Sequence, residues 1–98
     1  IAAGYADGIP RSASWHDGKP RGHVLIAAHK VPIVGRVSMD LITVDVTDIP
    51  ARQLAPGDDA ILYGPGLSIE DAGFDAGTIG YELLTRLGQR FERVYTAD

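Results

Sequence analysis

The strongest constraint on the fold is a strand-like run that breaks at a glycine. The run Pro32–Asp40 reads Pro-Ile-Val-Gly-Arg-Val-Ser-Met-Asp, and its β-branched part is interrupted at Gly35. The break places Arg36, Met39 and Asp40 close together. A buried strand does not need a charged pair around a glycine. A site that binds a small charged ligand needs such charged groups. The run therefore predicts a sheet strand that ends in part of a ligand site.

The rest of the chain reads mainly as further strands. Residues 41–46 alternate with a period of two, so Ile42, Val44 and Val46 should face the core. Further strands are expected at residues 23–28, 31–37, 59–63 and 91–96, with a turn at His29-Lys30 and a long surface loop over residues 9–22. This pattern predicts a mainly β fold, a small β-barrel or curled sheet with one or two short helices near the C-terminus.

The two helices are expected late in the chain. Ser68-Ile-Glu-Asp71 has the form of a capping box and opens a helix to about Gly73. Thr78 is expected to cap a second helix that ends before Gly88. Its core-facing stripe should consist of Ile79, Leu83 and Leu87, with Leu84 beside it.

Length and composition bound the protein class. The 98 residues form a single domain, residues 1–98. A net charge of -4 argues against nucleic acid as a partner, and no apolar run approaches the roughly 20 residues of a membrane span. The absence of cysteine excludes a disulfide scaffold and thiolate metal sites, and fits a cytoplasmic location. Ile1 is not a usual first residue, so the natural N-terminus is expected upstream.

Three segments offer local chemistry, each with a plainer alternative. Arg36 presents a planar fork that suits a carboxylate or phosphate, or it forms a weak surface pair with Asp40 at a β-bulge. Tyr5, held between two glycines in Gly4-Tyr-Ala-Asp-Gly8, lines a cleft or packs on a plain turn. Tyr81 lies near a helix N-terminus that could attract phosphate, or it packs in the core.

The sequence shows no complete reaction machinery. The three histidines, His16, His23 and His29, are scattered without metal-ligand spacing. Lys19 and Lys30 lie in polar segments, unlike a desolvated amine nucleophile. The residues alone predict part of a ligand site without a nucleophile–base pair or a metal site.

Three motifs together closely resemble the C-terminal domain of alanine racemases. They are Gly4-Tyr-Ala-Asp-Gly8, the run Pro32–Asp40, and Ala76-Gly-Thr-Ile-Gly-Tyr-Glu82-Leu-Leu-Thr-Arg-Leu-Gly88, and they occur in the family's order and spacing. The resemblance covers essentially the whole chain, including Arg93-Val-Tyr95 near its end. It departs at Ala27-Ala28-His29-Lys30, where the family often has an Asn-Gly or Gly-Gly turn, and at Gly73-Phe74, which should shorten the first helix.

The resemblance implies a pyridoxal-phosphate enzyme that interconverts L- and D-alanine for cell-wall synthesis. In the family, an N-terminal barrel binds the cofactor on a lysine, and the C-terminal domain closes the active site of the partner subunit in a homodimer. That barrel is absent from this chain, and so is the proton-transferring tyrosine, which lies upstream of the first motif. No catalytic residue is therefore expected here.

The resemblance also implies a role for seven residues. Met39 matches the residue whose backbone N–H meets the substrate carboxylate. Tyr81 matches a tyrosine that reaches the cofactor phosphate at the entrance, and Tyr5 matches a second entrance tyrosine. The remaining residues expected to line the site are Arg11, Arg36, Asp40 and Ile79.

Two alternatives to alanine racemisation remain open at this stage. One is a related racemase acting on serine or on several amino acids, because the residues that set side-chain preference are spread over both subunits. The other is a non-catalytic β-domain used for binding or assembly.

Overall fold

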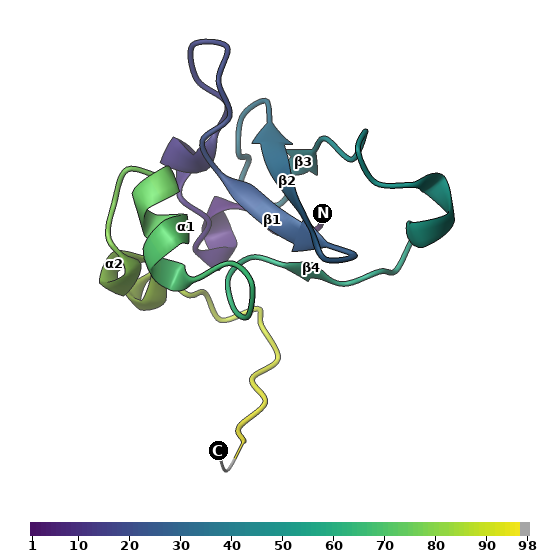
Figure 1. Cartoon of the computed structure of the whole chain (residues 1–98). Coiled ribbons are helices and arrows are strands. Elements are labelled where there is room, and N and C mark those ends of the chain that lie inside the picture. The colour runs from purple at the N-terminus through teal and green to yellow at the C-terminus, as the bar shows by residue number, and fades with distance from the viewer. Residues whose placement is uncertain (97–98) are drawn as a thin grey trace.

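The protein is a curled, open antiparallel sheet flanked by short helices, and the computed structural model describes residues 1–96 (Figure 1). The strands lie in the order β3-β2-β1-β4. They are β1 (His23–Ile26), β2 (His29–Val34), β3 (Thr43–Val44) and β4 (Ala60–Ile61). The helices are α1 (Ile69–Asp75) and α2 (Gly80–Thr85), with the 3-10 turns η1 (Tyr5–Asp7), η2 (Arg11–Ala13) and η3 (Ala51–Gln53). The predicted mainly β fold with a helical corner is confirmed.

The central hairpin turns at Ala27-Ala28, so the predicted turn at His29-Lys30 is wrong. Ile26 pairs with His29, which leaves a two-residue loop between β1 and β2. Ala27 and Ala28 have φ of 50° and 64°. Positive φ at both central residues is what a type I′ turn requires, and its twist matches the flanking strands. Two alanines carry no turn signal, so the sequence reads as a continuing strand.

Replacing Ala27-Ala28 by Asn-Gly is expected to raise the free energy of unfolding by about 1–2 kcal/mol, because a side chain in left-handed backbone costs roughly that much. Urea unfolding measures the change. The control is Ala51→Gly, at an exposed position without positive φ, which should give no gain. A less stable Asn-Gly variant would contradict the type I′ geometry.

The core lies under the central strands and confirms the predicted alternation. Ile42 is buried, and Val44 and Val46 pack partly buried against the same cluster, whereas Leu41 is exposed. The buried members of this cluster are Ala3, Ile9, Ala13, Val24, Ile26, Val31, Ile33, Val37, Ile42, Ile49 and Ala76. Strand β3 is shorter than predicted, although the side-chain pattern continues beyond its two paired residues.

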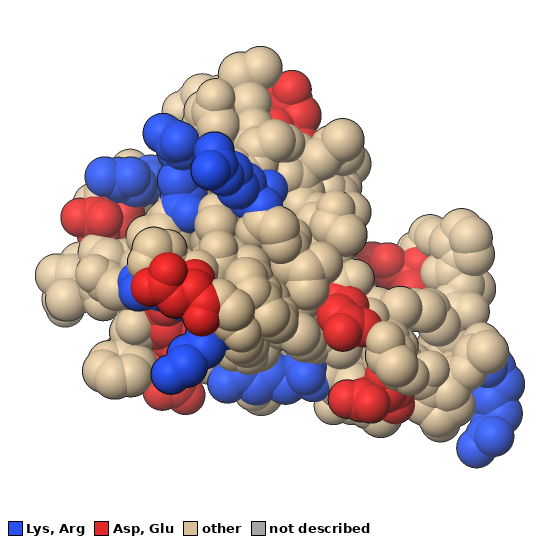
Figure 2. Space-filling model, turned by 90° about the horizontal axis from the view of Figure 1, so that it is seen from above, with Lys and Arg blue, Asp and Glu red and all other residues tan. Residues whose placement is uncertain are grey.

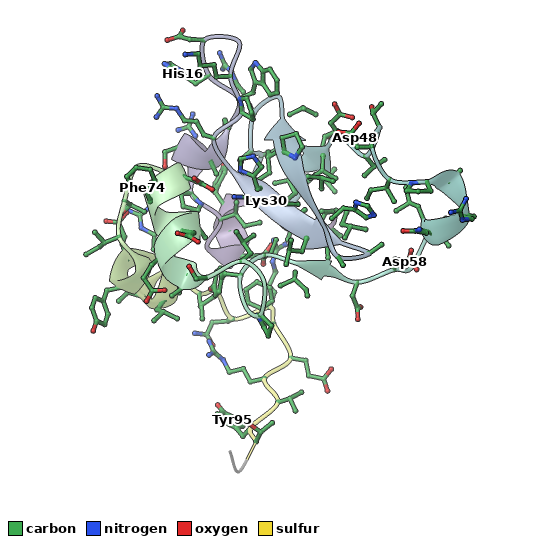
Figure 3. The ribbon with its side chains drawn as sticks, in the orientation of Figure 1. His16, Lys30, Asp48, Asp58, Phe74 and Tyr95 are labelled. Atoms are coloured by element: carbon green, nitrogen blue, oxygen red, sulfur yellow. The ribbon has the colours of Figure 1, made fainter. Side chains whose placement is uncertain are left out.

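Helix α1 begins as the sequence predicted. The Ser68 hydroxyl accepts a hydrogen bond from the Asp71 N–H at 3.1 Å, which satisfies one free donor of the first turn. At the other end of α1, Asp75 Oδ2 lies 3.4 Å from His23 Nδ1 and 3.8 Å from Lys30 Nζ. These two contacts link the helix to the sheet. Phe74 instead points away from the body of the protein (Figure 3).

Helix α2 differs from its prediction at both ends. It begins after Ile79 and ends at Thr85, so Ile79 occupies the N-cap position and Thr78 lies one residue too early to cap the helix. Leu83 is buried as predicted, but Ile79 is exposed and so does not belong to the core stripe. The predicted core-facing stripe is wrong at Ile79, because the helix starts one residue later than expected and Ile79 precedes its first turn.

The segment after α2 does not form the predicted strand at residues 91–96. It runs away from the sheet as an extended tail in which Val94 and Tyr95 are exposed (Figures 1 and 3). Apolar alternation predicts a strand, but a strand also needs a neighbouring edge to pair with. No helix within residues 1–96 is long and apolar enough to cross a membrane.

Candidate functional site

Two loops far apart in sequence meet at the predicted site. The Tyr5 N–H donates to the Ser38 carbonyl at 2.9 Å, and the Ala6 N–H donates to the Met39 carbonyl at 3.1 Å. A Cβ at Gly4 would lie 2.1 Å from the Ser38 oxygen. Only glycine allows this approach, so the first glycine of the motif is required for contact rather than for an unusual φ.

Met39 and Asp40 form the tip of a tight turn after the strand break. Strand β2 ends at Val34, and Gly35 follows with a φ of 69°, which confirms the predicted break. Ser38 closes the turn: its hydroxyl donates to the Leu41 carbonyl at 2.9 Å and accepts from the Leu41 N–H at 3.0 Å. The Ser38 hydroxyl thereby closes the turn without using the Met39 N–H.

The backbone N–H of Met39 is a free donor. Within residues 1–96 it has no hydrogen-bond acceptor, although the Met39 carbonyl is engaged. Met39 is about half exposed, at 51%, and Tyr5, whose backbone is hydrogen-bonded to the same turn, is 48% exposed. A backbone N–H without an acceptor, on a turn that is held in place, is suited to bind one carboxylate oxygen.

Asp40 is held by Arg90, a residue that the sequence did not single out. Arg90 Nη1 donates to Asp40 Oδ1 at 2.7 Å, while its Nε and Nη2 donate to the two carboxylate oxygens of Asp7 at 2.7 and 2.6 Å. The predicted alternative of an Arg36–Asp40 surface pair is not formed in the described residues. The one available signal was Asp7, because a carboxylate between two glycines in a packed loop needs a cationic partner.

The pairing changes the acid–base properties of both partners. Asp7 is only 4% exposed, and the hydrogen bond from Arg90 lowers the pKa of its carboxyl below the usual value. The hydrogen bond to Asp7, with that to Asp40, raises the pKa of Arg90 further above its ordinary range. The Arg90–Asp7 pair therefore stays charged at neutral pH, and Asp7 is unsuited to proton transfer.

Arg11 and Arg36 lie on two segments that run side by side. The Ser14 hydroxyl accepts from the Val37 N–H at 2.8 Å, and the Trp15 N–H donates to the Gly35 carbonyl at 2.9 Å. Both arginines are exposed, and neither forms an ion pair with another described residue. The face seen from above carries several groups of Lys and Arg side chains with Asp and Glu side chains between them (Figure 2).

Ile79 and Tyr81 lie apart from the two loops, at the start of α2. Both are largely exposed, at 66% and 79%. Their position depends on Gly73, because a Cβ there would lie 2.8 Å from the Ile79 backbone. No hydrogen bond within residues 1–96 joins Tyr81 to the other predicted site residues. The structure thus brings Tyr5, Met39 and Asp40 together and leaves Tyr81 on a separate exposed helix.

The predicted site residues do not line an enclosed pocket. A groove of about 660 Å³ lies between the sheet, both helices and the tail, and it is lined by Ile9, Leu83 and Phe91 among others. None of the seven predicted residues lines it. No group of three or more metal-binding side chains occurs among the described residues. The seven predicted site residues therefore lie on an exposed surface of this chain.

Comparison with known proteins identifies the family. Residues 1–95 match the family model for the alanine racemase C-terminal domain. An alanine racemase of Methylobacterium sp. is 47% identical over 97% of this chain, and a catabolic alanine racemase of Rhizobium johnstonii is 50% identical over 97%. The chain covers 25% and 24% of those two relatives.

A solved structure shares the fold as well as the sequence. The alanine racemase from Bartonella henselae, determined with covalently bound pyridoxal phosphate, superposes with a TM-score of 0.86 at 44% identity. The match covers 98% of this chain and 26% of that one. This chain therefore belongs to the family of alanine racemase C-terminal domains.

Proposed function

We propose that this chain is the C-terminal domain of a pyridoxal-phosphate-dependent alanine racemase and completes the active site on a partner subunit. The observation that carries the proposal is the contact of Tyr5 and Ala6 with the Ser38–Met39 turn, where the exposed residues Tyr5 and Met39 and the free Met39 N–H lie on an open surface instead of in a pocket. A surface of this kind is half of a site. The chain spans about a quarter of the length of its relatives, which leaves room for a domain that supplies the other half.

The residues present fit a supporting role towards the cofactor. Lys30 approaches Asp75 on the sheet, and Lys19 lies in an exposed loop, so neither stands beside Tyr5 and Met39 to bind the cofactor covalently. The exposed Tyr81 phenol offers a donor for a phosphate oxygen. When bound, pyridoxal phosphate supplies the electron sink that stabilises negative charge on the substrate α-carbon.

The exposed residues of the proposed site bind the substrate or line the entrance through which it arrives. The Met39 N–H donates to the substrate carboxylate, and Asp40 beside it is ion-paired with Arg90, which it shares with Asp7. Tyr5 lines the inner entrance. The outer entrance consists of Arg11, Arg36 and Ile79. Proton transfer at the α-carbon belongs to a lysine and a tyrosine of the upstream chain.

The cellular setting follows from the same proposal. The enzyme is a cytoplasmic homodimer in which two C-terminal domains each cover the partner's barrel, and its product D-alanine serves cell-wall synthesis. The exposed side chains of Tyr5, Met39, Ile79 and Tyr81 support an interface at the proposed site, because large exposed apolar side chains gather at contact surfaces.

The decisive experiment measures racemisation by the full-length protein that contains this chain, purified with pyridoxal phosphate. D-alanine should form from L-alanine, and at equal substrate concentration faster than D-serine forms from L-serine. Faster conversion of serine would move the assignment to the related serine racemases. No turnover of either amino acid by a cofactor-loaded, folded protein would favour a non-catalytic binding domain.

Tyr81→Phe in the full-length protein is expected to weaken cofactor and substrate binding by about tenfold, because the loss of one hydrogen bond to a charged group costs roughly 1.5 kcal/mol or more. Cofactor titration and the KM for alanine measure it. The matched control is Tyr95→Phe, on the exposed tail. Wild-type KM together with wild-type cofactor affinity in Tyr81→Phe would remove Tyr81 from this role.

Met39→Ala is expected to change kcat/KM by less than about fivefold, because the proposed contact is made by the backbone N–H and the variant keeps it. Steady-state kinetics on the full-length protein test this expectation. A loss as large as that on removing a catalytic base, on the order of a hundredfold or more, would show that the side chain itself acts.

A further inference from the structure

Arg90 joins the two loops of the proposed site through a single side chain. It lies 83 residues from Asp7 and 50 residues from Asp40 in sequence, and all three of its guanidinium nitrogens donate to these carboxylates. Asp7 Oδ2 also accepts from the Gly4 N–H at 3.1 Å. Asp7 belongs to the turn that carries Tyr5, and Asp40 follows Met39 directly.

The backbone after α2 is seated on the same turn. A Cβ at Gly8 would lie 2.6 Å from the Arg86 carbonyl oxygen, and a Cβ at Gly88 would lie 2.6 Å from the Ala6 carbonyl oxygen. These two close approaches fix the segment that ends in Arg90 against η1. The guanidinium therefore reaches Asp7 and Asp40 from a held position, which favours a bidentate, planar interaction.

The geometry points to Arg90 as a positioning residue, which fixes the Tyr5 turn relative to the Met39 N–H. This inference rests on the proposed function, because the two groups it aligns are those assigned to the entrance and to the substrate carboxylate. Only an arginine suits the position. A lysine ammonium is a point charge that can neutralise Asp7 but cannot form the fork on Asp7 and reach Asp40 together.

The same arrangement explains why Asp7 tolerates burial. A carboxylate that is nearly enclosed needs both charge compensation and hydrogen bonds to its oxygens, and Arg90 with the Gly4 N–H provides them. Without the guanidinium, the bond to Asp40 is lost first. Asp40 is half exposed, and Arg90 is its one ion-pair partner among the described residues. The expected defect is therefore a loosened Met39–Asp40 turn within a folded domain.

The test compares Arg90→Lys and Arg90→Gln with Arg86→Gln in the full-length protein. Arg86 is the matched control because it lies four residues away and forms only an exposed pair with Glu82, at 3.7 Å. The first readout is amide hydrogen exchange of Tyr5 and Ala6, whose N–H groups donate to the Met39 turn. Exchange should be on the order of tenfold faster in both Arg90 variants and unchanged in Arg86→Gln.

The second readout is kinetic. Arg90→Lys should lower kcat/KM for alanine by at least about tenfold, and Arg90→Gln by about a hundredfold, while the absorbance of the bound cofactor is retained. Amides of the β1–β2 hairpin serve as the internal reference for global stability. If Arg90→Gln does not fold, Arg90→Lys, which keeps the charge beside Asp7, decides the question.

Two results would overturn the inference. One is wild-type exchange at Tyr5 and Ala6 in Arg90→Lys, and the other is equally faster exchange in the hairpin, which would reveal a general structural role. If the wild-type protein does not racemise alanine, the proposed function fails, and the exchange comparison still decides whether Arg90 joins the loops.

Discussion

Replacing Gly4 with alanine is expected to lower kcat/KM of the full-length protein by about a hundredfold, because misplacing a substrate-binding group by about 1 Å costs that much. The added Cβ would lie 2.1 Å from the Ser38 carbonyl oxygen and 2.5 Å from the Met39 carbonyl. Both neighbours are backbone atoms, so the clash is relieved only by separating the two loops. The hydrogen bonds from Tyr5 and Ala6 to that turn are lost in the process.

The control for Gly4→Ala separates a loss of protein stability from a displacement of the two site loops. Gly57 has a φ of 95° and open space around its Cα, so Gly57→Ala strains the backbone without moving the site. Gly57→Ala should lower the unfolding midpoint and leave kcat/KM unchanged. Wild-type kinetics in Gly4→Ala would show that the contact between the two loops does not determine activity.

The isolated chain, residues 1–98, is expected to show no racemisation at all. It contains two lysines, of which Lys30 pairs with Asp75 and Lys19 is exposed, while the hydrogen bond from Arg90 lowers the pKa of the buried Asp7 and keeps it ionised. Without a base on either face of the α-carbon, the chain lacks the proton transfers that typically contribute about 10²–10⁴-fold each. The measurement is D-alanine formation from L-alanine with added pyridoxal phosphate.

The full-length protein in the same assay is the positive control for the isolated chain. Circular dichroism and unfolding of the isolated chain show whether it is folded when tested. Formation of D-alanine above the rate with cofactor alone, by the folded chain, would contradict the assignment of both bases to the upstream domain.

Local rules predicted those parts of the fold that depend on neighbouring residues. The Gly35 break, the inward-facing Ile42 and the Ser68 cap all follow from backbone freedom, period-two alternation and a side-chain oxygen next to free N–H groups. These features are decided within a few residues, so the sequence contains what is needed to recognise them.

The errors occur where a distant partner decides the outcome. Ala27-Ala28 forms the hairpin turn because the pairing of β1 with β2 imposes it, at the cost of two left-handed alanines. Thr78 fails to cap α2 because the helix begins one residue later than predicted, after Ile79, whose backbone packs against Gly73 of α1. The predicted strand at residues 91–96 is not formed, because the segment does not pair with either edge of the described sheet.

The candidate site divides in the same way. The motifs around Tyr5, Met39 and Tyr81 were enough to recognise the family to which the chain belongs. The roles of these three residues in binding stay predictions that the experiments above test. Arg90 was missed because nothing in its neighbourhood marks it: its partners Asp7 and Asp40 are distant in sequence, and an arginine in a polar stretch usually lies on the surface.

The sequence by itself determined the family, the strand break and the inward face of the sheet, since these depend on residue types at short spacing. Only the tertiary structure decided that the Gly4 and Ser38 backbones touch, that the Met39 N–H stays free, and that Arg90 bridges Asp7 and Asp40. The physical reason is that hydrogen bonds and ion pairs have strict distance limits. Whether two groups meet those limits is set by how the chain returns on itself.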